Sequence, residues 1–234
     1  CSLSRISRSR SITNYKIMNS EKITEKIKEN LNSSDQFDDW DKLQSTDADY
    51  MMYSPTPVGY NTTAEQRYLM QNLLTGFYNA SILDIGCGRA DLYDFLTNFY
   101  PDLSVAYHGI DHNPIMTALA KEKYDTECIT GAFETAKMPK AEWVVANGVF
   151  TPRRCETEDE DLRKLFEDID ILYKHAQVAV SFNLLNPINN THHEGFFYVH
   201  PGLILDMLIE KYENVVLRNN YSKDIYTVTI YKNQ

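Results

Sequence analysis

The stretch SILDIGCGRADL, residues Ser81 to Leu92, decides how this chain folds. Its first half, residues 80–85, is an apolar run with one late acid, which predicts a buried strand. Two glycines then break the strand, and residues 92–96 resume at helical spacing. We therefore expect a strand, a tight glycine turn and the start of a helix. Bare backbone and unpaired N–H groups in such a turn can meet a ligand.

Two ligand classes use such a turn. Dinucleotide-binding domains carry G-x-G-x-x-G with pyrophosphate on the helix N-terminus, but Asp91 stands in the place of the third glycine and would repel it. The string from Asp84 to Gly88 instead resembles the first motif of class I S-adenosylmethionine (SAM)-dependent methyltransferases. SAM carries no phosphate. Its ammonium and sulfonium groups are positive, so a site that contains Asp84 suits it.

Length and composition bound the remaining choices. The chain has 234 residues, 43% hydrophobic and 24% charged, as expected for a soluble globular protein. No apolar run reaches the roughly 20 residues that span a membrane. A formal net charge of −10 argues against broad nucleic-acid binding. Four cysteines without a C-x-x-C pair favour a reducing compartment, hence a cytoplasmic protein, rather than a disulfide framework.

The N-terminal part differs from the rest. Residues 1–17 hold three arginines, one lysine and no acid, and we expect this basic tail to lie outside the fold. It could be an organelle-targeting segment, sequence upstream of a start at Met18, or an arm that docks on a protein partner. Residues 18–61 form an extension, with an amphipathic helix at 21–31 and an aromatic lid or collar at 50–60. Residues 62–234 form the predicted SAM-binding domain.

Strand and helix patterns alternate along that domain, which predicts an α/β fold. The predicted strands are residues 80–85, 105–110, 128–133, 142–146, 176–182, 215–219 and 225–231. The predicted helices are residues 62–78, 92–98, 115–123, 162–173 and 201–212. The last two strands have only a tight connection between them. The resemblance to class I methyltransferases therefore implies a seven-stranded, mostly parallel sheet with a C-terminal antiparallel hairpin and helices on both faces.

The resemblance also implies which residues bind SAM. The methionine part would meet Asp84, Gly86, Cys87 and Gly88. Asp111, which ends the second predicted strand, suits the ribose hydroxyls, and the adenine would lie near His112 and Phe133. The alternatives are an exposed loop histidine and a core phenylalanine. The family often has an acid for the adenine where this chain has Ala132, so either Glu134 substitutes or backbone groups suffice. Asn147 and Gly148 would border the methyl group.

The acceptor side is less defined. Tyr60, Phe150, Asn183 and His192 are candidate substrate contacts. The segment 147–150 lacks the two prolines typical of amino-methyltransferases of nucleic acids, which favours a small molecule or a protein as acceptor. Arg153 and Arg154 could meet an anionic substrate or belong to a solvated loop. Adjacent residues 192–194 rarely form a metal site alone, so no metal is predicted.

No catalytic acid or base is predicted, because SAM is already activated and positioning can supply most of the catalysis. Segments 147–150, 182–183 and 198–201 are similar to a group of class I methyltransferases from bacteria and bacterial viruses. The expected function is methyl transfer from SAM to an unidentified acceptor. The main alternative is a non-catalytic module of the same fold within a larger assembly. A nucleotide-dependent oxidoreductase is a second alternative, disfavoured by Asp91.

Overall fold

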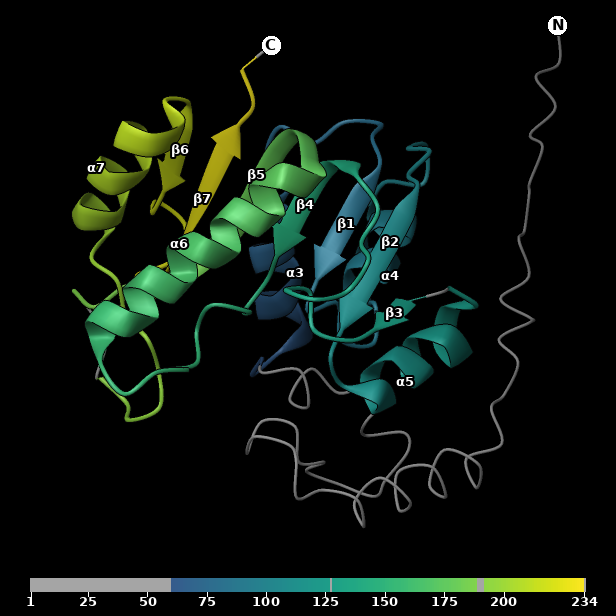
Figure 1. The fold of residues 1–234 in the computed structure, drawn as a ribbon. Coiled ribbons are helices and arrows are strands. Elements are labelled where there is room, and N and C mark those ends of the chain that lie inside the picture. Colours follow the sequence, from purple (N-terminus) through teal and green to yellow (C-terminus); the bar gives the residue numbers. More distant parts are fainter. Residues whose placement is uncertain (1–59, 127, 189–191, 234) are drawn as a thin grey trace, which may run out of the picture.

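The structure is a computed structural model that describes residues 60–126, 128–188 and 192–233 (Figure 1). The predicted basic tail, residues 1–17, lies outside the described residues. So does the predicted extension up to residue 59, with its helix and most of its lid. The boundaries drawn between these parts therefore remain predictions. Tyr60 and Asn61 are described and lead into the first helix.

Seven strands form one sheet in the order β3-β2-β1-β4-β5-β7-β6. Their bounds are β1 (Ile82–Ile85), β2 (Tyr107–Asp111), β3 (Cys128–Thr130), β4 (Ala141–Ala146), β5 (Ala176–Leu185), β6 (Val215–Arg218) and β7 (Ile225–Tyr231). The strands β1 to β5 pair in parallel, and β7 is antiparallel to both of its neighbours. This confirms the predicted fold class. The chain order reverses between β1 and β4, and ligands of open α/β sheets bind outside the strand ends at such a point.

Five described helices surround the sheet: α3 (Thr63–Leu73), α4 (Asp91–Phe99), α5 (Pro114–Tyr124), α6 (Glu158–His175) and α7 (Pro201–Tyr212). Figure 1 shows α6 in front of the sheet and α3 behind it. Among the described helices, none combines the length and the apolar composition that a membrane crossing requires.

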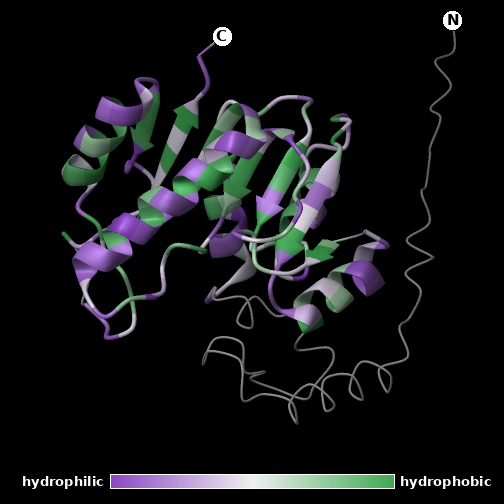
Figure 2. Ribbon diagram, viewed as in Figure 1, coloured by the Kyte–Doolittle hydropathy of each residue, from purple (hydrophilic) through white to green (hydrophobic). Residues whose placement is uncertain are grey.

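Alternation along β4 divides the core between the two faces. Trp143 and Val145 pack with residues of α3 and α4, whereas Val144 and Ala146 pack with residues of α6 and α7. All four side chains are buried, so β4 is covered on both sides, as a central parallel strand should be. Figure 2 shows hydrophobic residues along β4 and β5, whereas hydrophilic and hydrophobic residues alternate along α6.

Several element boundaries differ from the predicted ones: β3 ends at Thr130 instead of residue 133, for example, and three of the other differences have a clear physical cause. Helix α3 ends at Leu73 instead of residue 78, and Gly76 follows it with a φ of 89°. Helix α6 begins at Glu158 instead of residue 162, because Thr157 and Glu160 form a capping box there. Strand β5 continues to Leu185, three residues beyond the predicted end, because residues 179–185 pair with the whole of β7.

Candidate cofactor site

The turn after β1 has left-handed backbone at alternate residues. Gly86, Gly88 and Ala90 have φ values of 65°, 54° and 60°. A Cβ atom on Gly86 would stand 2.6 Å from a methyl carbon of Val149, so a larger residue at position 86 would clash as well as strain the backbone. The Cys87 N–H group donates to the Ile110 carbonyl oxygen at 3.0 Å, which ties the turn to β2. The turn is therefore built tightly against two neighbouring strand ends.

Asp84 is a buried carboxylate within β1, two residues before this turn. It is 3% exposed and accepts a hydrogen bond from the Tyr107 hydroxyl at 2.7 Å. Burial raises the pKa of Asp84 to about 7, the Tyr107 hydrogen bond opposes the rise, and the nearby carboxylates Asp111 and Asp91 add to it. Among the described residues, Asp84 forms no ion pair. A positively charged ligand group would supply the partner that this carboxylate lacks.

Asp111 links the end of β2 to the elements on both sides of it. One carboxylate oxygen accepts from the Gly88 N–H group at 2.8 Å, and the other accepts from the Asn113 N–H group at 2.8 Å. The side chain thus holds the glycine turn and the start of α5 at the same strand end. Asp84 and Asp111 come together at adjacent strand ends, as the sequence predicts. The ribose contact of Asp111 remains a prediction.

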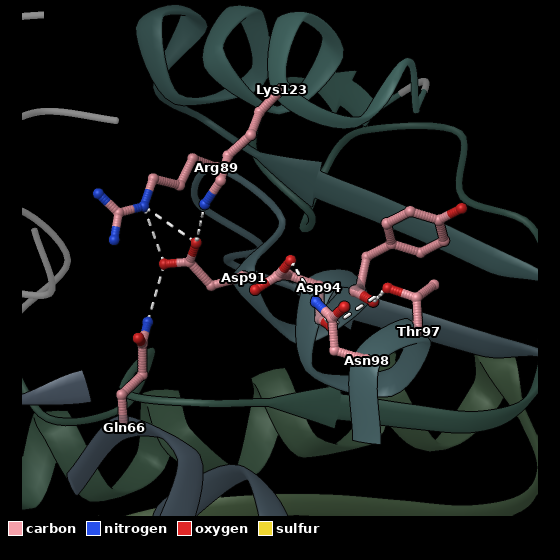
Figure 3. Close-up of polar contacts among 8 residues, drawn as sticks. Gln66, Arg89, Asp91, Asp94, Thr97, Asn98 and Lys123 are labelled. Atoms are coloured by element: carbon pink, nitrogen blue, oxygen red, sulfur yellow. Dashed lines mark hydrogen bonds and ion pairs between the residues drawn. The ribbon is translucent and has the colours of Figure 1, made fainter. Parts of the chain in front are cut away.

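A polar network behind the glycine turn is centred on Asp91, the first residue of α4 (Figure 3). Its carboxylate accepts from Gln66 of α3 at 2.8 Å and from the buried Arg89 Nε at 2.9 Å. Lys123 of α5 lies 3.3 Å from the same carboxylate. Three helices therefore meet at this acid, which also suits the positive end of the α4 dipole. A ligand phosphate at this helix end would have to displace that arrangement.

Neutral polar groups mark the ends of β4 and β5. The Gly148 N–H group donates to Asn183 Oδ1 at 2.7 Å, and Asn183 Nδ2 donates to Asn147 Oδ1 at 2.5 Å. The side chain of Asn147 also interacts with the Tyr60 hydroxyl. That hydroxyl lies 3.9 Å from the point where a Cβ atom on Gly148 would stand. The structure thus brings together Tyr60, Asn147, Gly148 and Asn183, which come from three separate parts of the sequence.

Two predicted contact residues turn away from the strand ends. Phe150, a predicted substrate contact, is 1% exposed and packs edge-on against Phe182 in the core. The ring belongs to the core cluster that lies between the sheet and the helices α6 and α7. The Cys87 side chain faces β2: its Sγ atom and that of Cys128 lie 2.8 and 2.7 Å from the point where a Cβ atom on Gly109 would stand. Only its backbone is available to a ligand at the turn.

The other predicted residues lie partly or fully at the surface of the protein. The His112 side chain is 58% exposed and its Nδ1 atom lies 3.8 Å from Asp111 Oδ1. Phe133 is partly exposed and packs at the margin of the core. His192 is exposed and stacks on Tyr198 with ring centroids 4.6 Å apart. Glu134, the suggested substitute for an adenine acid, lies 3.6 Å from Lys164 of α6.

The two arginines of the loop after β4 have partners within the protein. Arg154 lies 2.6 Å from the fully buried carboxylate of Asp168, and Arg153 Nε lies 3.2 Å from Asp161. Asp161 also accepts the backbone N–H groups of Arg154 and Cys155. These arginines anchor the loop to α6. Neither the predicted substrate contact nor a freely solvated loop describes them.

One further residue of the site, Tyr107, was not among the residues predicted from the sequence. A tyrosine within an apolar strand is usually a packing residue, and nothing in the pattern shows that its hydroxyl reaches Asp84.

In the part of the chain that the structure describes, no group of three or more His, Cys, Asp or Glu side chains is arranged to hold a metal ion.

The sheet order, the antiparallel last hairpin and the glycine turn after β1 define the fold of class I SAM-dependent methyltransferases. No family model matches this sequence, and neither does any curated protein. The comparison with known proteins therefore rests on similarity to solved structures.

One such structure is the plantazolicin methyltransferase BpumL with S-adenosylhomocysteine (SAH), 13% identical over 92% of this chain and 100% of that chain, with a TM-score of 0.57. Human N-acetylserotonin methyltransferase with SAM is 15% identical over 80% of this chain and 58% of that chain, with a TM-score of 0.55. Magnesium protoporphyrin IX methyltransferase from Synechocystis PCC 6803 with SAH is 11% identical over 79% of this chain and 97% of that chain, with a TM-score of 0.53. At such low identities, the TM-scores show a shared fold alone.

Proposed function

We propose that this protein is a SAM-dependent methyltransferase. The proposal rests on Asp84. Its carboxylate is 3% exposed, has no cationic partner among the described residues, and lies beside the glycine turn where the strand order of the sheet reverses. Burying a charge without a partner is costly. The α-ammonium group of SAM would provide that partner. Solved structures of this fold contain SAM or SAH, which supports the same ligand here.

The residues present fit this cofactor. Asp84 would hold the ammonium group, and the backbone at Gly86 and Gly88 would allow close approach to the methionine part. Asp111 lies at the next strand end, where the ribose hydroxyls would be expected. Asp91 occupies the helix end that a dinucleotide would need for its phosphates, so a nucleotide-dependent oxidoreductase fits less well.

SAM, when bound, supplies a methyl group on a sulfonium that a nucleophile can displace. The contribution of the chain is to orient the two reactants and to exclude water. Tyr60, Asn147 and Asn183 form an uncharged polar wall at the ends of β4 and β5. Burial and the carboxylates Asp84, Asp91 and Glu65 raise the pKa of Tyr60, so its hydroxyl stays protonated and is no general base. We assign no catalytic residue.

For the acceptor, we favour a small molecule or a protein over a nucleic acid. The net charge of −10 repels polyphosphate backbones. Arg153 and Arg154, the two cations of the loop beside the proposed methyl position, are engaged by Asp161 and Asp168. An acceptor that needs cationic recognition would have to break these ion pairs.

Isothermal titration with SAM and with SAH tests the proposal. We expect micromolar binding of both compounds by the wild-type protein and its loss in Asp84→Ala. The exposed Asp102→Ala variant is the matched control and should bind normally. Absence of binding by the folded wild-type protein would contradict the proposal. If binding is found, a screen of acceptors with labelled methyl groups follows. Tight binding without transfer would favour the non-catalytic module.

A further inference from the structure

Two free cysteines from separate parts of the chain converge beside the glycine turn. A Cβ atom on Gly109 of β2 would stand 2.8 Å from Cys87 Sγ and 2.7 Å from Cys128 Sγ. Both distances end at the same point, so the two sulfur atoms are no farther apart than the two distances combined. The sulfur atoms therefore share the space that a side chain at position 109 would fill.

The topology of the sheet explains why two residues so far apart in the sequence meet. Strand β2 lies between β1 and β3. Cys87 follows β1, and its N–H group donates to the Ile110 carbonyl oxygen, so the turn lies against β2. Cys128 begins β3 and pairs with Gly109 in the β2–β3 register. The two sulfur atoms thus reach β2 from opposite sides, at a position where that strand has no side chain.

The two thiols differ in their access to solvent. Cys87 is 7% exposed, and its thiol donates to the Gly88 carbonyl oxygen, with sulfur and oxygen 3.6 Å apart. Cys128 is half-buried and lies on β3, which is an edge strand. The neighbouring Cys128 thiol, burial and two nearby carboxylates raise the pKa of Cys87. A reagent in solution would therefore react first at Cys128, and Cys87 would react second.

We infer that Cys87 and Cys128 form a redox-sensitive thiol pair, a modification site for small-molecule disulfides, and that its oxidation links the glycine turn to β3 and lowers the affinity for SAM. The existence of the thiol pair does not depend on the proposed function. Its effect on SAM rests on that function.

The reaction consists of two thiol–disulfide exchanges. The Cys128 thiolate attacks one sulfur of a small disulfide such as oxidised glutathione, and the S–S bond breaks. One glutathione leaves as a thiolate and takes up the proton that Cys128 released. The Cys87 thiolate then attacks the Cys128 sulfur and displaces the second glutathione, which takes up the proton of Cys87. In total the two cysteines lose two electrons and two protons, and the small disulfide gains both.

Oxidation would change the glycine turn in two ways. It removes the S–H group of Cys87, so the Gly88 carbonyl oxygen loses this donor. It also draws the two sulfur atoms into bonding distance, which pulls the turn toward β3. The Gly88 N–H group is bound to Asp111, so such a movement also disturbs that hydrogen bond. The proposed binding of SAM depends on this same backbone.

The test uses the full chain with Cys1→Ser and Cys155→Ser, which leaves the pair as its only thiols. The protein is equilibrated at pH 8 in mixtures of reduced and oxidised glutathione, quenched with acid and analysed by intact mass and peptide mapping. We expect an internal disulfide between Cys87 and Cys128 without bound glutathione, reversed by dithiothreitol. Peptide mapping of the wild-type chain should give the same linked peptides.

Titration with SAH measures the effect on the turn. We expect the oxidised protein to bind SAH about fivefold more weakly than the reduced protein, because the turn loses a hydrogen bond. Cys128→Ser in the same background is the matched control, since position 128 lies outside the proposed cofactor site. It should form no internal disulfide and should bind SAH equally in both buffers.

The outcomes separate the two proposals. Glutathione adducts at one or both cysteines without an internal disulfide would overturn the thiol pair. An internal disulfide that leaves the affinity for SAH unchanged would overturn its effect on the glycine turn. If the reduced protein binds no SAH, the proposed function fails together with that effect, while the mass measurement still decides whether the thiol pair exists.

Discussion

Two regions of this protein bury carboxylates, and they do so in opposite ways. In α6, Asp161 and Asp168 are 2% and 0% exposed, and each meets an arginine of the preceding loop. At the end of β1, Asp84 is 3% exposed, and its hydrogen-bond partner among the described residues is the neutral Tyr107. A buried acid with cationic partners serves the fold. A buried acid without them costs folding free energy and marks a place where a ligand completes the charge balance.

The largest expected effect is on Asp84→Asn, which keeps the side-chain shape and removes the charge. We expect the affinity for SAH to fall about 100-fold at pH 8, because a charge-assisted hydrogen bond is lost. Stability should change the other way. A pKa raised from 3.8 to about 7 means that ionisation costs stability as the pH rises through that interval.

Asn avoids this cost, so the variant should be about 2 kcal/mol more stable at pH 8 and show little gain near pH 4. Isothermal titration and urea unfolding measure the two quantities. A variant that loses both affinity and stability at pH 8 would remove the distinction between the two regions.

The next effect concerns the paired region. Arg154→Ala leaves the fully buried Asp168 with Lys164 alone, and we expect a loss of about 2–3 kcal/mol in urea unfolding. Arg153→Ala should cost less than about 1 kcal/mol, because Asp161 keeps two backbone N–H donors. The affinity of both variants for SAH should equal that of the wild type. A changed affinity would show that the loop arginines take part in binding.

Tyr107→Phe should give a smaller effect, and it tests how the carboxylate of Asp84 is stabilised. The Tyr107 hydroxyl stabilises the carboxylate, so its removal should raise the pKa of Asp84 further. Binding of SAH needs the ionised carboxylate and should increase with pH around a midpoint near 7. In Tyr107→Phe we expect that midpoint to move up by about one pH unit. Tyr93→Phe, whose ring contacts Tyr107, is the control. An unmoved midpoint would mean that Tyr107 does not support Asp84.

The smallest expected effect concerns Ala90, where backbone strain can be tested without changing any charge. Ala90 is fully buried with φ at 60°, a conformation that is unfavourable for a residue with a Cβ atom. Replacement by glycine relieves this strain and adds chain entropy to the unfolded state, so we expect a net gain of about 0.5 kcal/mol. Gly86→Ala should instead destabilise, since its Cβ atom would meet Val149 at 2.6 Å. Urea unfolding of both variants checks the contrast, which a loss of stability in Ala90→Gly would contradict.

Local patterns predicted most of the fold. Apolar runs located β1, β4 and β7. Pro201 marked the start of α7, and the predicted range of that helix matches the observed one at both ends. The errors arose where long-range pairing or capping decides. Strand β5 extends to Leu185 because β7 lies beside it, so Asn183 belongs to a strand and not to the predicted loop. The capping box at Thr157 starts α6 one turn early.

The candidate site was predictable where residues lie at a strand end or directly after it. Asp84, Gly86, Gly88 and Asp111 do so, and the structure brings them together. Partners across the sheet were not predictable from one sequence. The contact of Tyr107 with Asp84 spans 23 positions, and the hydrogen bond of Asn183 with Asn147 spans 36. The side of the backbone that Phe150 takes after Gly148 depends on a left-handed turn, which no hydrophobic pattern encodes.

The packing of Trp143 gives the protein an optical reporter. Its indole is 2% exposed in β4, between the rings of Phe77 and Tyr231 at centroid distances of 5.8 and 6.0 Å. An indole in such an apolar setting emits at shorter wavelength than one in water, so unfolding should shift its fluorescence to the red. The chain has one other tryptophan, Trp40, and Trp40→Phe would leave a single emitter at the centre of the sheet.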